Sequence, residues 1–130
     1  MNARSTVRRS PCTLADARAR LHDARAFLDA AELVEDQDVR ATNAIHAAIA
    51  AADAICCGVL GERSSDGNHQ SAIGLLAAVD SGLANALSRA VSRKNQAAYE
   101  SRDISGSDAE ACIRQARTLL DAARARLASI

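Results

Sequence analysis

The segment AAIAAADAICCGVL, from Ala47 to Leu60, constrains the fold of this 130-residue chain more than any other feature. A helix that is apolar on almost every side is buried in the middle of a bundle. Only 2% of the residues are aromatic, although 48% are hydrophobic, so Leu, Ile, Val and Ala must fill the core. Alanine has the highest helix propensity, and its small side chain lets helices approach closely. The sequence therefore predicts a closely packed helical bundle around this segment.

The rest of the chain also carries apolar residues at helical spacing, and we find no strand pattern. We expect residues 1–12 to form a flexible tail and residues 13–130 to form one domain. The predicted fold is an all-α, five-helix antiparallel bundle. Its helices should cover about residues 13–34, 38–60, 69–79, 83–99 and 107–127.

Two helix starts show the spacing of a capping box. Thr13 is followed three residues later by Asp16, and Ser107 is followed by Glu110. We expect Thr13 and Ser107 to be the N-caps of the first and last helices. Tyr99, the only tyrosine, is expected to pack at the end of the fourth helix.

Charge and cysteine content give the next expectations. The 16 basic and 16 acidic residues cancel, so the chain lacks the charge excess typical of tight non-specific binding to nucleic acids or membranes. The basic N-terminus is followed by no apolar signal region, and we predict no membrane segment and a cytoplasmic location. The four cysteines have no zinc-site spacing, so we expect reduced, buried thiols, no disulfide framework, no metal and no cofactor. These are Cys12, Cys56, Cys57 and Cys112.

Most motifs of enzyme active sites are absent, but Arg63 and His69 stand close together in a polar, glycine-containing loop. A guanidinium group can hold a phosphate through two parallel hydrogen bonds. An imidazole titrates near neutral pH and can transfer protons. The pair could therefore cleave RNA without a metal. A single histidine cannot serve at once as acid and base, but two copies of the chain across a two-fold axis would supply both.

The segments NAIHAAIAAADAICCGVLGERSSDGNH (43–69) and LSRAVSRKNQAAY (87–99) resemble the core of the HEPN family. Ribonucleases of that family carry Arg, four to six residues, and then His, as Arg63 and His69 do here. The resemblance implies a homodimeric, metal-independent endoribonuclease that leaves 2′,3′-cyclic phosphate ends, as toxins and defence effectors of the family do. Arg63 would bind phosphate, His69 would be the general acid/base, and Ser64, the polar residue that follows the arginine, would be the third catalytic residue.

Further substrate contacts are predicted at Asn68, Arg93 and Lys94. The alternative within the same family is a non-catalytic module that binds a nucleotide or a partner protein, such as a nucleotidyltransferase-type antitoxin. A third interpretation is a plain helical interaction domain in which the Arg63–His69 spacing is accidental. Ser71 stands where some toxins of the family carry a tyrosine that the antitoxin modifies, so the sequence does not support control by modification at that position.

Two other features have a structural interpretation. Arg40 and His46 repeat the spacing, but six residues within one helix place the two side chains on different faces. Asp53 lies in the apolar segment on the same face as His46. A buried carboxylate needs a partner, and we favour a structural hydrogen bond that fixes helix packing.

Overall fold

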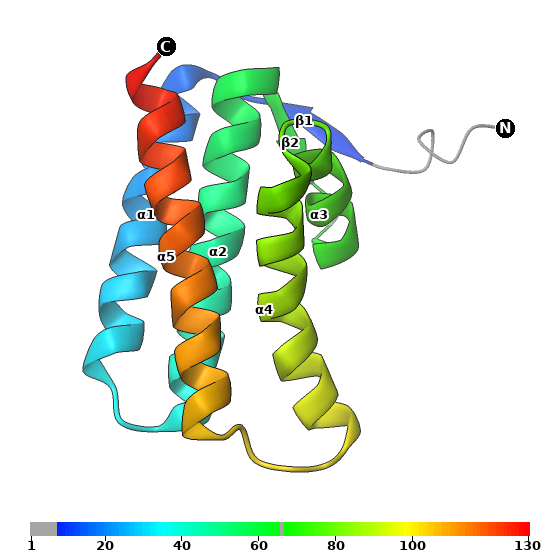
Figure 1. Ribbon diagram of the computed structural model, residues 1–130. Helices are drawn as coiled ribbons and strands as arrows, with labels where there is room; N and C mark the ends of the chain where they lie inside the picture. Colours follow the sequence, from blue (N-terminus) through cyan, green and yellow to red (C-terminus); the bar gives the residue numbers. More distant parts are fainter. Residues whose placement is uncertain (1–7, 66) are drawn as a thin grey trace, which may run out of the picture.

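The computed structural model describes residues 8–65 and 67–130, and within them the chain is an all-α bundle of five helices with one pair of very short strands (Figure 1). This confirms the predicted fold class. The elements in chain order are β1 (Arg9–Pro11), α1 (Leu14–Leu33), α2 (Gln37–Leu60), β2 (Glu62–Ser64), α3 (His69–Ala77), α4 (Ser81–Tyr99) and α5 (Gly106–Ala128).

The central position predicted for the apolar segment is confirmed, because α2 packs against all four other helices. Its buried residues are mostly alanines, and Ile55 is fully buried among them. By length and composition α2 could cross a membrane, but 67% of its most apolar window is buried inside the bundle, as in the core helix of a soluble protein. Val59, in the last turn of α2, is 45% exposed, so the apolar segment is not buried over its whole length.

One of the two predicted N-caps is confirmed, and the other is wrong. Thr13 Oγ1 accepts a hydrogen bond from the backbone N–H of Asp16, and Asp16 accepts one from the N–H of Thr13. The last helix begins two residues earlier than predicted, with Ser105 and Asp108 forming the capping box. Glu110 does not reach back to Ser107, because its carboxylate pairs with Arg40 on α2.

The prediction that no strand exists is wrong, and so is the flexible tail from Arg9 onward. β1 and β2 pair antiparallel, with Ser10 opposite Arg63. An ion pair of 3.0 Å between Arg9 Nη1 and Glu62 Oε1 adds to this pairing. Three-residue strands are too short to show an alternating pattern in the sequence, and their pairing depends on residues more than fifty positions apart. Residues 1–7 lie outside the described part of the chain.

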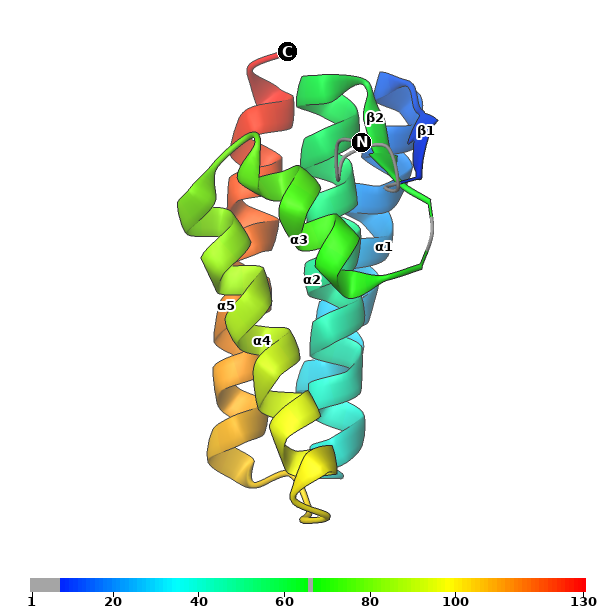
Figure 2. The same cartoon turned by 90° about the vertical axis from the view of Figure 1, so that its right-hand side faces the viewer.

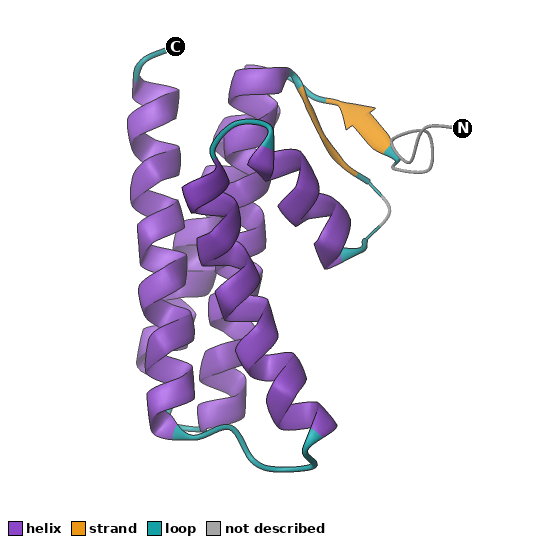
Figure 3. Ribbon diagram, turned by 45° about the vertical axis from the view of Figure 1, so that its right-hand side comes forward, coloured by secondary structure: helices purple, strands orange, loops and turns teal. Residues whose placement is uncertain are grey.

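The expectation of four reduced cysteines is also wrong. Cys12 and Cys57 form a disulfide with their Cα atoms 5.5 Å apart, whereas Cys56 and Cys112 are free and buried. The pair is 45 residues apart in sequence, a separation that no motif would reveal. The bond ties the residue that follows β1 to the last turn of α2. Figure 3 shows the two strands at that end of the bundle, beside α3.

Candidate functional site

Arg63 is positioned by the abrupt end of α2. Gly61 terminates the helix in the left-handed conformation, with φ of 71°, and its N–H donates to the carbonyl oxygen of Cys57 at 3.1 Å. Glycine adopts this conformation without steric cost. The chain therefore turns directly from α2 into β2, and Arg63 is the middle residue of that strand.

His69 is positioned by the start of α3. Asn68 is the N-cap, and its side-chain oxygen accepts a hydrogen bond of 2.8 Å from the N–H of Gln70. The prediction that His69 opens a helix is therefore confirmed. Its imidazole is exposed at the end of the short helix, which crosses the side of α2 (Figure 2).

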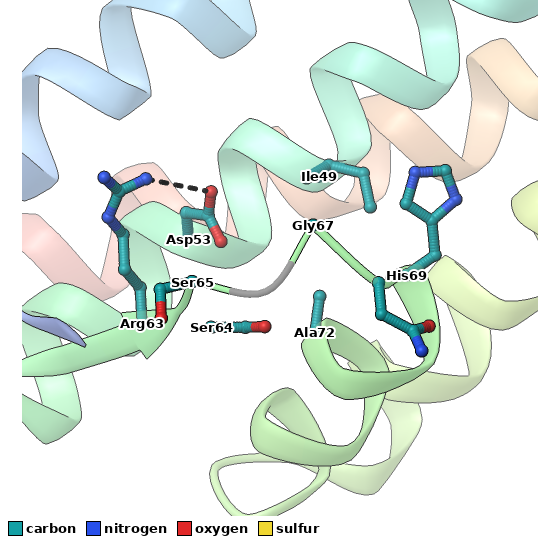
Figure 4. Close-up of a pocket in the computed structure, with 9 residues that line it drawn as sticks. Ile49, Asp53, Arg63, Ser64, Ser65, Gly67, His69 and Ala72 are labelled. Atoms are coloured by element: carbon teal, nitrogen blue, oxygen red, sulfur yellow. Dashed lines mark ion pairs between the residues drawn. The ribbon is translucent and has the colours of Figure 1, made fainter. Parts of the chain in front are cut away.

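Arg63 and His69 line one open cavity of about 320 Å³, which we call the Arg63 cleft. Four of the predicted site residues line it: Arg63, Ser64, Asn68 and His69. Figure 4 shows the guanidinium group and the imidazole at opposite sides of this cleft, with Ile49 and Asp53 of α2 behind them. The remaining lining residues are Ser65, Gly67 and Ala72.

The carboxylate of Asp53 determines the electrostatics of the Arg63 cleft. It is 7% exposed and accepts a hydrogen bond of 3.1 Å from Arg20 Nη2. The predicted structural bond is thus confirmed, with Arg20 of α1 as its donor. Arg63 Nη1 lies 3.9 Å from the same carboxylate oxygen, Oδ2.

Burial raises the pKa of Asp53 above its ordinary value, although the nearby charges of Arg20 and Arg63 act in the opposite direction. Desolvation therefore outweighs the two ion pairs. When ionised, this single carboxylate faces two guanidinium groups. The carboxylate of Asp53 therefore partly neutralises the charge that Arg63 could offer to an anion. It also holds the guanidinium group toward α2.

A second, smaller cavity of about 140 Å³ adjoins the first, and His69 lines both. We call it the Lys94 cleft. Lys94 and Asn95 come to it from α4, and Thr42, Ile45 and His46 come from α2, with Val91 completing the lining. The structure thus brings the predicted Lys94 beside His69.

Arg93 does not join the site, which corrects its predicted role. It lies on another face of α4, where Nη1 is 3.3 Å from Asp108 Oδ1 on α5. Arg102 binds the same carboxylate at 2.9 Å, and this hydrogen bond lowers the pKa of Asp108 to about 2. Adjacent residues on a helix point about 100° apart, so Arg93 and Lys94 could not both face one cleft. Tyr99 is 91% exposed, so its side chain is not packed at the helix end, contrary to expectation.

His46 is the residue of the site that the sequence did not reveal. The second Arg–His match is accidental as expected, because Arg40 pairs with Gln37 and Glu110 while His46 lies against Phe27. The centroids of the His46 and Phe27 rings are 5.2 Å apart. The shared face of His46 and Asp53 was visible in the sequence, but the approach of α3 and α4 to that face was not.

Comparisons with family models, curated protein sequences and solved structures find no match for this chain. The fold and the two clefts define it as an all-α bundle with a polar, histidine-containing groove, and the HEPN resemblance stays a prediction. Within residues 8–65 and 67–130, no group of three His, Cys, Asp or Glu side chains is placed to hold a metal ion.

Proposed function

We propose that this protein is a metal-independent endoribonuclease of the HEPN type that leaves 2′,3′-cyclic phosphate ends. The observation that supports it best is that Arg63, Ser64, Asn68 and His69 line one open cleft. A cation and a proton-transfer group on one cavity supply the phosphate-binding group and one of the two proton-transfer groups needed to cleave a phosphodiester through the neighbouring 2′-hydroxyl. In this proposal Arg63 binds the backbone phosphate, and His69 transfers protons.

The test is cleavage of RNA by the purified protein in EDTA. His69→Ala should reduce the rate by about 100-fold or more, the usual contribution of general acid–base catalysis. His22→Ala is the matched control, because His22 lies on α1 and its side chain is 83% exposed. A His69→Ala variant that cleaves RNA at the wild-type rate contradicts the mechanism.

A homodimer belongs to the proposal, because a second copy would bring a second His69. Its mass in solution can be measured directly by light scattering. For location we propose the cytoplasm, where a toxin or defence effector would meet its RNA. Thiols are kept reduced there, so the Cys12–Cys57 bond would form only transiently.

The second candidate function is a non-catalytic module that binds a nucleotide or a nucleotidyltransferase-type partner. The Asp53–Arg63 ion pair favours it, since it reduces the charge that Arg63 can offer to a transition state. This module would bind a nucleoside monophosphate measurably and would leave RNA intact, in the wild type as in His69→Ala.

A further inference from the structure

The two clefts share His69 and lie one after the other along a face of α2, and together we call them the groove. His46, Ile49 and Asp53 lie on this face at positions i, i+3 and i+7, which span about 10 Å along the helix axis. His69 lines both clefts, so it stands where they meet. Arg63 and His46 therefore belong to different ends of the same groove.

The two ends differ in charge. In the Arg63 cleft, a buried carboxylate already pairs with the guanidinium group. None of the seven residues that line the Lys94 cleft is acidic, and three of them carry or can acquire a positive charge: His46, His69 and Lys94. Across the described residues, no carboxylate forms an ion pair with Lys94. Thr42 and Asn95 add hydrogen-bonding groups. An anion would therefore be bound more strongly at this end.

The Lys94 cleft has room for a phosphate group, because its volume of about 140 Å³ exceeds the roughly 30 Å³ that one water occupies several times over. The imidazole of His46 is supported by the ring of Phe27, at an interplanar angle of 34°. A packed ring keeps its orientation better than a free one.

We propose that the Lys94 cleft binds the phosphate group that is cut, with His46 and His69 as its two proton-transfer groups. This inference rests on the proposed ribonuclease function and adds His46 as a catalytic residue. One imidazole takes the proton of the 2′-hydroxyl as that oxygen forms a bond to phosphorus. The other, protonated, gives its proton to the 5′ oxygen as the bond from phosphorus to that oxygen breaks. The products are a 2′,3′-cyclic phosphate and a 5′-hydroxyl.

The other cations then have separate tasks. Lys94 neutralises the phosphate that reacts, and Arg63 holds the backbone at the next phosphate along the groove. Because His46 and His69 come from α2 and α3 of one chain, a single protomer contains both the acid and the base. Cleavage then does not require a second copy of His69.

The binding half of the proposal is tested with inorganic phosphate. The chain has only three histidines, so the imidazole proton signals can be followed individually by NMR at pH 6, where an imidazole carries substantial charge. The signals of His46 and His69 should shift along one binding curve, while that of His22 stays in place. Lys94→Ala should weaken binding about tenfold. A His46 signal that does not respond, or equal shifts of all three histidines, overturns the site.

The catalytic half is tested with His46→Phe, which keeps an aromatic ring against Phe27 but cannot transfer a proton. We expect its RNA cleavage to fall by about 100-fold or more, as in His69→Ala. His46→Phe that cleaves at the wild-type rate overturns the inference while the ribonuclease function stands. A wild-type protein that binds phosphate between the two imidazoles but cleaves no RNA supports the anion site and ends the ribonuclease proposal.

Discussion

The interface of α2 with α5 and the layer formed by β1, β2 and α3 are held together in different ways. Between α2 and α5 the contact is made by buried small and aliphatic side chains over the length of both helices. At Gly58 even an added methyl group would lie 2.5 Å from Leu127 Cδ2. The β1–β2–α3 layer has few buried residues and depends on single links, among them the Cys12–Cys57 disulfide and the Arg9–Glu62 ion pair.

The difference shows how stability and function are divided in this molecule. A continuous apolar interface distributes its stabilisation over many residues and fixes the helices closely. A layer held by a few links can keep polar side chains at the surface, where a ligand reaches them. Both clefts have α2 as floor; the rim of the Arg63 cleft comes from β2 and α3, and that of the Lys94 cleft from α3 and α4.

The largest loss of stability is expected in the continuous core. Ile55→Ala removes a fully buried side chain from α2 and should lower the free energy of unfolding by about 2–5 kcal/mol. Leu33→Ala is the control, because Leu33 is 83% exposed and its truncation should change stability by no more than about 0.5 kcal/mol. Urea denaturation followed by circular dichroism measures both. Equal effects would mean that α2 is not the centre of the bundle.

The next effect is expected at the disulfide. Cys12→Ser removes a link across 45 residues and should cost about 2–4 kcal/mol. A reducing agent should destabilise the wild type by a similar amount and leave Cys12→Ser unchanged. The loss should be accompanied by faster amide hydrogen exchange in β2, since β1 is then tied to the bundle only by hydrogen bonds and ion pairs. Equal hydrogen exchange in β2 with and without the bond would contradict this account of how Arg63 is positioned.

The same division explains what the sequence could reveal. Helical spacing of apolar residues is a local pattern, and it predicted all five helices and the central place of α2. The strand pair, the disulfide and the Arg20–Asp53 bond join residues at least 33 positions apart, and no local pattern contains them. His69 was found because arginine and histidine stood close in sequence. His46 was not, because only the approach of α3 and α4 makes it part of a site.

A smaller effect, with a defined pH dependence, is expected for Asp53→Asn, which changes the residue between the two regions. Burial raises the pKa of Asp53, so the folded chain binds this proton more tightly than the unfolded chain. The resulting stabilisation is complete below the ordinary pKa of 3.8 and is lost as the pH rises through the raised value. As the pH rises from 3.8 through the raised pKa of Asp53, the free energy of unfolding of the wild type should therefore fall relative to that of Asp53→Asn. A difference between the two proteins that is constant with pH contradicts the desolvation of this carboxylate.

The smallest effect is expected at the cap of α5. Ser105→Ala should cost about 1 kcal/mol at neutral pH, because it removes the oxygen that accepts from the N–H of Asp108. Ser107→Ala removes a hydroxyl that lies 3.1 Å from Ser105 Oγ but leaves that acceptor in place, so it should cost only a few tenths of this amount. The Asp108 half of the box has its own pH signature: its lowered pKa, about 2, gives stability that is present above 3.8 and lost as the pH falls through about 2. Asp108→Ala should remove this acid dependence in thermal unfolding. If Ser107→Ala costs more than Ser105→Ala, the helix begins where the sequence alone predicted, and a local signal would have been sufficient at this end of the bundle.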